Sequence, residues 1–99
     1  MKFTVMQLKN IRDVDYAFMD YEFARKHDFK LKDYKEVYHS EMYVDDGETT
    51  EHFLDSVFTT FNIFRPDDFN GHSMSVSDII KLEDGRVFYV DSIGYAEVK

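Results

Sequence analysis

Cysteine and tryptophan are absent from this 99-residue sequence, which also contains a single proline and only four glycines. Without cysteine the chain can form neither a disulfide nor a thiolate metal site, and this composition fits a reducing cytoplasm. No apolar run approaches the length of a membrane span, and Met1–Leu8 lacks the basic start of a signal peptide. With no linker or repeat, residues 1–99 are expected to form one cytoplasmic domain.

Basic residues are also scarce, and the charge balance restricts the partners of the chain. Twelve Lys and Arg residues stand against twenty Asp and Glu residues, which gives a formal net charge of −8. Such a field repels nucleic acid and anionic membranes, and it favours a protein partner with a basic surface. The alternative is that the acidity only keeps a small protein soluble.

The strongest local pattern is a β-hairpin near the C-terminus. Two β-rich runs, residues 77–83 and 86–91, flank Asp84-Gly85, a pair that favours a two-residue type I′ turn. Such a loop fixes four opposite pairs: Glu83 with Arg86, Leu82 with Val87, Ile80 with Tyr89, and Asp78 with Asp91. Both faces of the hairpin would be largely apolar, so we expect it to lie inside a larger sheet.

The other elements follow from hydrophobic periodicity. Alternation predicts strands near residues 3–9 and 35–44, and Asp20 is expected to cap a short helix over 21–27. Apolar residues at helical spacing predict a longer helix over 51–61, capped by Thr49 or Thr50. Together these elements predict an α+β fold: an antiparallel sheet of about four strands, with the longer helix packed on one face.

Side-chain patterns within these segments predict the core. In the longer helix, Phe53, Leu54, Val57, Phe58 and Phe61 form one apolar stripe. In the strand over 35–44, the face carrying Tyr38, Ser40, Met42 and Val44 is the better core candidate. Ile63, Phe64 and Phe69 bracket a turn around Pro66 and are expected to pin it to the core.

Three motifs in the last third of the chain stand at a specific spacing. They are Arg65-Pro66-Asp67-Asp68-Phe69, the run Gly71-His72-Ser73-Met74-Ser75-Val76-Ser77-Asp78, and Tyr89-Val90-Asp91-Ser92-Ile93-Gly94. In these motifs the chain resembles the YodL-like domain family. The resemblance implies a protein of plasmids, conjugative elements or phages of low-GC Gram-positive bacteria, often encoded beside antirestriction-type modules. It implies no catalytic residues and no ligand.

The run from Gly71 to Asp78 superficially resembles a nucleophile elbow, but the final glycine and the strand-turn-helix context are missing. A triad of His72, Ser73 and Asp78 would lack a second element to supply an oxyanion hole. We therefore expect no enzyme, and no catalytic, cofactor-binding or metal-binding residues. The sequence predicts a structural loop whose polar side chains satisfy backbone groups, namely those of His72, Ser75, Ser77, Asp78 and Asp91.

Two carboxylates, Asp78 and Asp91, would face each other in the predicted hairpin register. Like charges so placed repel, so one carboxyl is protonated, a cation or donors neutralise the pair, or the strands splay first. In the last case, which is favoured, Asp91 would form an Asx-turn toward Gly94. The four histidines show no zinc-site spacing.

Five acidic residues gather around the start of the longer helix: Asp45, Asp46, Glu48, Glu51 and Asp55. Carboxylates here complement the helix dipole, but that explanation covers only one turn. The cluster is therefore predicted to bind a partner with a basic surface. The resulting hypothesis is an inhibitor or regulator from a mobile genetic element that blocks a nucleic-acid-targeting defence complex of the anti-CRISPR or antirestriction type. The alternatives are a structural or adaptor domain of a conjugative element, and a small ligand-binding domain.

Overall fold

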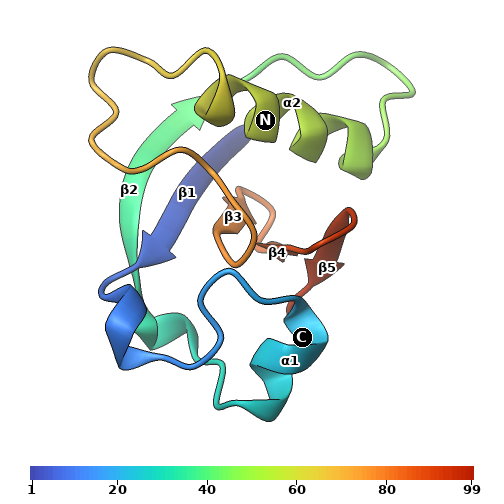
Figure 1. The fold of residues 1–99 in the computed structure, drawn as a ribbon. Coiled ribbons are helices and arrows are strands. Elements are labelled where there is room, and N and C mark those ends of the chain that lie inside the picture. Colours follow the sequence, from blue (N-terminus) through green and yellow to red (C-terminus); the bar gives the residue numbers. More distant parts are fainter.

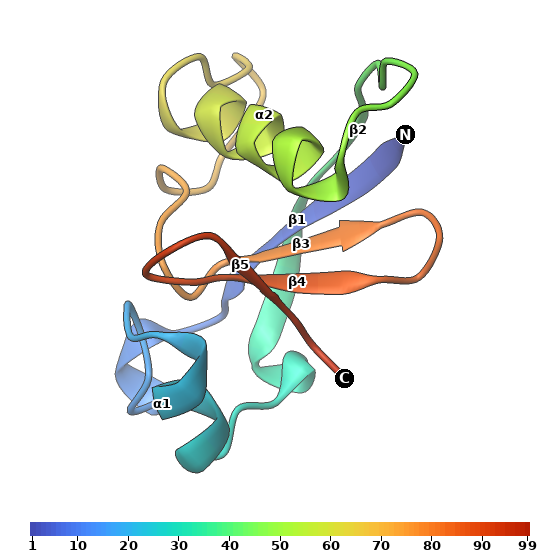
Figure 2. The same ribbon diagram turned by 90° about the vertical axis from the view of Figure 1, so that its right-hand side faces the viewer.

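The computed structural model describes residues 1–99 and contains a five-stranded antiparallel sheet in the order β2-β1-β3-β4-β5. Figures 1 and 2 show helix α2 on one side of this sheet and helix α1 on the other. The α+β prediction is confirmed, with a short fifth strand that the sequence pattern did not indicate. The elements are β1 (Lys2–Leu8), α1 (Tyr21–Lys26), β2 (Tyr34–Glu41), α2 (Thr50–Asn62), β3 (Ile79–Leu82), β4 (Val87–Val90) and β5 (Tyr95–Glu97), with 3-10 helices at Ile11–Asp13 and Leu31–Asp33.

Strand β1 is central and pairs with β2 on one edge and with β3 on the other. Its alternating sequence divides its side chains between the two faces of the sheet. Phe3 and Val5 are buried in the core beneath α2, whereas Met6 and Leu8 belong to the core on the α1 side. A strand buried on both faces explains why this segment carries so few charges.

Helix α2 supplies one side of the larger core. The Thr49 hydroxyl accepts a hydrogen bond from the backbone N–H of His52 and caps the helix, as predicted. The apolar stripe of the helix faces the sheet, where Phe3 contacts Phe53 and Phe61 edge to face. None of the helices is long and apolar enough to span a bilayer.

The smaller core, on the α1 side of the sheet, is built mainly from aromatic rings. Tyr16, Phe29, Tyr34 and Tyr89 contact one another there. The predicted cap is present, because the Asp20 carboxylate accepts a hydrogen bond from the backbone N–H of Phe23 at 2.8 Å. Two of the tyrosines donate their hydroxyls to main-chain carbonyls at 2.6 Å, Tyr34 to Ser77 and Tyr89 to Met19. The buried hydroxyl of Tyr16 has no hydrogen-bond partner.

The β3–β4 hairpin lies inside the sheet as predicted, but its predicted register is wrong by one residue. Ile80 pairs with Phe88, not with Tyr89, because the loop contains three residues instead of two. The backbone N–H of Gly85 donates to the carbonyl of Leu82 at 3.0 Å, and Gly85 has a φ of 95°. This is a type I turn followed by a left-handed residue, which an Asp-Gly sequence also permits.

Two further local expectations need correction. Strand β2 ends at Glu41, short of the predicted residue 44, although Met42 and Val44 still pack against the larger core. Ile63 and Phe64 are exposed, and only Phe69 of the three predicted anchors is buried. The turn around Pro66 therefore leaves two large apolar side chains in solvent.

Candidate functional site

A groove runs along the seam between α2 and the C-terminal strands. It consists of two adjoining hollows, of about 440 and about 250 Å³, that share Gly94 and Tyr95. Its floor is apolar and is formed by Leu54 and Phe58 of α2 together with Val76, Phe88 and Val90. Ile93, at the tip of the β4–β5 turn, stands at its rim and is 92% exposed.

The rim of this groove is negatively charged. Its carboxylates are those of Glu51, Asp55 and Glu97. Asp91 also lines the groove, but its carboxylate binds the backbone N–H of Tyr21 at the start of α1. The basic residue in the lining is Arg86, whose Nη2 lies 2.8 Å from Oδ2 of Asp84 and whose Nη1 donates to the Thr50 hydroxyl at 2.9 Å. Because Asp84 neutralises Arg86, the groove presents a net negative field to solvent.

One carboxylate of the rim is fixed in place. The Tyr95 hydroxyl donates to Oδ1 of Asp55 at 2.7 Å. Burial and this hydrogen bond raise the pKa of Tyr95, so the phenol stays protonated and remains a donor. The bond joins α2 to β5 across the groove, and it holds the Asp55 carboxylate at the rim.

The five acidic residues predicted to bind a partner do not form one surface. Asp45 and Asp46 are exposed in the β2–α2 loop, and Glu51 and Asp55 lie at the groove. Glu48 points inward: its side chain is 7% exposed, and its carboxylate accepts from the backbone N–H of Asp45 and lies 3.6 Å from His52 Nδ1. Glu48 thus stabilises the loop and contributes little to the accessible charge.

The groove also contains acidic residues that the sequence pattern did not connect with this cluster. Asp91 and Glu97 are more than thirty residues from Asp55 in the chain, and the pairing of β4 with β5 brings them to the seam. The carboxylate of Asp91 accepts a hydrogen bond from the backbone N–H of Tyr21, the first residue of α1. A second run of acidic residues, Asp13, Asp15, Asp20 and Glu22, belongs to the segment that leads into and begins α1, on the other side of the sheet from α2.

The loop before β3 is organised around the buried Asp78. Its side chain is 3% exposed, and its Oδ2 accepts hydrogen bonds from the backbone N–H of Ser75 at 2.9 Å and from Gln7 Nε2 at 3.1 Å. Gln7 also donates to the carbonyl of His72 at 2.9 Å. Burial raises the pKa of Asp78 to about 6, against the opposing effects of Ser75, His72 and Gln7. Gln7 is a site residue that sequence reasoning missed.

The imidazole of His72 also contacts residues of this loop, namely Ser73 and Asp78. Its Nδ1 lies 2.7 Å from the carbonyl of Ser73, which can only accept, so this nitrogen carries the proton. Its Nε2 lies 3.8 Å from Oδ1 of Asp78. The packing around Gly71 is close, because a Cβ there would meet Gln7 Oε1 and lie 2.8 Å from Cζ of Phe69.

Ser77 and Asp91 hold a different part of the chain, the segment that leads into α1. The Ser77 hydroxyl accepts from the backbone N–H of Phe18 at 2.9 Å, and its carbonyl accepts from the Tyr34 hydroxyl at 2.6 Å. Oδ1 of Asp91 accepts from the backbone N–H groups of Tyr21 at 3.1 Å and Ser92 at 2.8 Å.

The predicted pairing of Asp78 with Asp91 is therefore wrong. In the observed register Asp78 stands opposite Val90, with which it forms a backbone hydrogen bond of 2.8 Å. Its side chain binds Gln7 on the α2 side, whereas the side chain of Asp91 reaches the first residue of α1 on the other side. The backbone N–H of Asp91 donates to the carbonyl of Gly94, which closes the turn before β5.

No group of three or more His, Asp or Glu side chains is placed to hold a metal ion. A further hollow of about 540 Å³, over the ends of β1, β2 and β3, is lined by charges of both signs, which include Lys2, His39, Glu41, Lys81 and Glu83. The α2–β5 groove differs because its floor is apolar and the one basic side chain in its lining, Arg86, is paired with Asp84.

These features define a small α+β domain with an acidic surface groove. The chain belongs to the YodL-like domain family, whose model matches residues 2–99, and the resemblance seen in the sequence is confirmed. No curated protein and no solved structure matches the chain.

Proposed function

We propose that this chain is a small acidic inhibitor or regulator carried by a mobile genetic element. It acts in the cytoplasm by binding a basic protein surface of a host nucleic-acid-targeting defence complex, of the anti-CRISPR or antirestriction type. The observation that supports this proposal is the α2–β5 groove, where the carboxylates of Glu51, Asp55 and Glu97 border an apolar floor and the neighbouring Arg86 is already paired with Asp84.

The groove combines the two properties that a protein interface needs. The apolar floor contributes affinity when water leaves it, and the carboxylate rim selects a partner that carries lysines or arginines. At a net charge of −8, long-range attraction also accelerates the encounter with a basic surface. The same field disfavours DNA, RNA and anionic membranes as direct partners.

The test is a charge-reversal experiment on the exposed carboxylates near the start of α2. A triple variant with Asp45→Lys, Asp46→Lys and Glu51→Lys changes charges that make no hydrogen bond essential to the fold. Purified CRISPR effectors and restriction endonucleases are assayed for cleavage of target DNA with the wild type or the variant, at low and moderate salt. We expect inhibition by the wild type, weakened by salt, and loss of inhibition by the triple variant.

A matched control reverses the same number of charges elsewhere. The variant with Asp33→Lys, Glu36→Lys and Asp67→Lys has the same net charge as the test variant but keeps the β2–α2 loop, the groove and the acidic segment before α1. It should inhibit nearly as well as the wild type. If the folded test variant inhibits as well as the wild type at every salt concentration, the cluster is only a solvated face and the proposal is wrong. Failure of the wild type to inhibit any of these enzymes also counts against it.

A further inference from the structure

One aromatic residue is held in an unusual position on the surface. Phe18 is 52% exposed and has a φ of 65°, a left-handed conformation that bulky side chains rarely adopt. The next residue, Met19, is exposed as well. A strained backbone that presents two large apolar side chains to solvent requires an explanation other than core packing.

Three side chains from the last third of the chain, those of Ser77, Tyr89 and Asp91, fix this segment. The Ser77 hydroxyl accepts from the N–H of Phe18, and the Tyr89 hydroxyl donates to the carbonyl of Met19 at 2.6 Å. The carboxylate of Asp91 accepts from the N–H of Tyr21. Phe18 is thus presented on a rigid backbone, and its binding to a partner would cost little conformational entropy.

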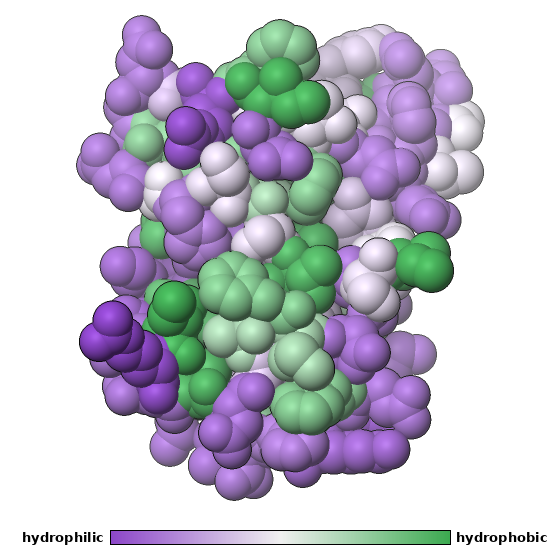
Figure 3. All heavy atoms as spheres, in the orientation of Figure 1, coloured by the Kyte–Doolittle hydropathy of each residue, from purple (hydrophilic) through white to green (hydrophobic).

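Phe18 does not stand alone on this face. Figure 3 shows apolar side chains gathered between α2 and α1 on the face turned to the viewer. Ser77, which binds Phe18, follows Val76, and Val76 lines the groove together with Phe58. The apolar floor of the groove and the Phe18–Met19 pair therefore belong to one surface, which we term the front band and define by Phe18, Met19, Phe58 and Val76.

Acidic residues accompany this band at both ends. The segment from Asp13 to Glu22, which contains Phe18, carries four carboxylates and no lysine or arginine. At the α2 end, Asp55 and Asp91 line the same hollow as Phe58 and Val76. The partner that complements this surface must itself combine an apolar stripe with flanking positive charges.

The backbone of the band limits how a partner can attach. The N–H of Met19 donates to the carbonyl of Tyr16, and the N–H of Ser77 donates to the carbonyl of Val90, each at 2.9 Å. The carbonyls of Met19 and Ser77 accept from tyrosine hydroxyls. Because the main-chain groups of Met19 and Ser77 are already paired, an added β-strand would find no hydrogen bonds at these two residues, which favours a contact made by side chains.

We propose that the front band is the docking site for a basic amphipathic α-helix of the partner protein, with Phe18 as the central anchor. The inference rests on the proposed protein-binding function and names the element of the partner that is bound. An amphipathic helix satisfies its own backbone and offers an apolar stripe between rows of lysine or arginine. Aromatic anchors of this kind carry much of the energy of an interface.

The experiment uses a designed helical peptide as the probe. A peptide of leucine, alanine and lysine, with the leucines on one helical face, is titrated into the full chain by calorimetry at low salt. A second peptide has the same composition in scrambled order and lacks the apolar stripe. We expect the amphipathic peptide to bind about tenfold or more tightly than the scrambled one.

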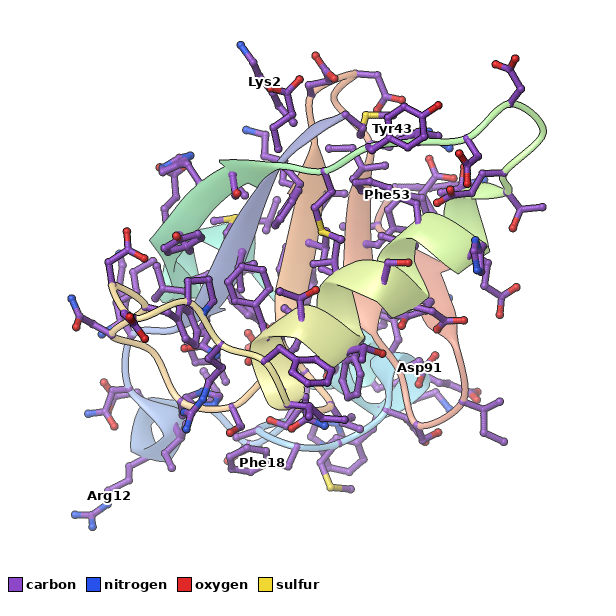
Figure 4. All side chains as sticks on the ribbon, turned by 90° about the horizontal axis from the view of Figure 1, so that it is seen from above. Lys2, Arg12, Phe18, Tyr43, Phe53 and Asp91 are labelled. Carbon is purple, nitrogen blue, oxygen red and sulfur yellow. The ribbon has the colours of Figure 1, made fainter.

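Two variants identify the contact. Phe18→Gly removes the ring, and glycine accepts the left-handed backbone, so the variant should unfold at the same temperature as the wild type or higher. Phe18→Gly should bind the amphipathic peptide no more tightly than the scrambled peptide. Tyr43→Ser is the control, because Tyr43 is an exposed aromatic on the far side of α2 from Phe18 in Figure 4, and it should bind both peptides as the wild type does.

The outcomes separate this inference from the proposed function. Helix docking is overturned if the two peptides bind equally, or if folded Phe18→Gly binds the amphipathic peptide as tightly as the wild type does. Neither result bears on inhibition by charge attraction, which the nuclease assay tests separately. Failure of either peptide to bind at low salt also overturns helix docking. If the amphipathic peptide binds the wild type but not Phe18→Gly, and no nuclease is inhibited, the helix-binding site is supported and the proposed function is wrong.

Discussion

Replacement of Asp78 by asparagine should remove a pH-dependent loss of stability from this protein. The carboxyl is almost completely buried, and burial raises its pKa from an ordinary 3.8 to about 6. A group whose pKa is raised by folding contributes stability that is fully present below the unfolded pKa and is lost as the pH rises through the folded pKa. The difference of about two units corresponds to about 3 kcal/mol.

The geometry indicates that asparagine can take the place of the carboxylate. An amide oxygen at the position of Oδ2 can accept from both Ser75 and Gln7, as the carboxylate does. The amide nitrogen would then face Nε2 of His72, which lies 3.8 Å from Oδ1 of Asp78 and is free to accept in the neutral ring. The variant should therefore fold, and it avoids the cost of burying a charge.

The assay compares the free energy of unfolding of wild type and Asp78→Asn in urea, at matched salt, between about pH 4 and about pH 7. When the free energies of unfolding of the two proteins are subtracted at each pH, the contributions of the other carboxylates cancel. Asp78→Asn should gain about 3 kcal/mol relative to the wild type as the pH rises. Repetition of the pair with His72→Gln separates the effect of the neighbouring imidazole. A difference that stays constant, or changes in the opposite direction, would refute the argument that burial dominates at Asp78.

Three further substitutions test the packing of the fold. Phe61→Ala removes a fully buried ring of α2 and should lower the free energy of unfolding by about 3 to 5 kcal/mol; a loss below about 1 kcal/mol in urea would show that α2 is not docked. Gly71→Ala forces a Cβ against Phe69 and should destabilise by about 1 to 3 kcal/mol, visible as a lower melting temperature, whereas an unchanged value contradicts the close approach. Tyr34→Phe leaves the carbonyl of Ser77 without its donor and should lower the free energy of unfolding by about 1 to 3 kcal/mol, visible in the same melts. An unchanged melting temperature would show that water replaces the hydroxyl at this carbonyl.

Sequence reasoning worked where one physical requirement controls the pattern. The stripe of α2 repeats at helical spacing because one face must meet the sheet, and Phe53, Leu54 and Val57 are buried as predicted. Strand β5 was missed because three residues are too few for a period to be recognised. The hairpin register was wrong because Asp84-Gly85 is compatible with loops of two and of three residues, and only the packing of both faces selects between them.

The candidate site was less accessible from the sequence than the fold. Glu51 and Asp55 were recognised as a local cluster, but Asp91 and Glu97 join them only through the order of the strands. Gln7 is 71 residues from its partner Asp78, and a single glutamine in an alternating strand gives no signal. The inward position of Glu48 also depends on the path of the β2–α2 loop, which charge patterning does not describe.

The central position of β1 has a consequence for synthesis of the chain on the ribosome. Val5 pairs with Tyr38 on one edge and with Ile80, about 75 residues away, on the other. Until residues 79–82 have emerged, β2 is the one strand partner that β1 has, so its inner edge is open and its apolar residues lack the β3–β4 hairpin. An open strand edge is a template for other chains, and chaperones protect such intermediates. A ribosome that pauses before this point therefore holds an aggregation-prone nascent chain, and release of the hairpin closes that edge.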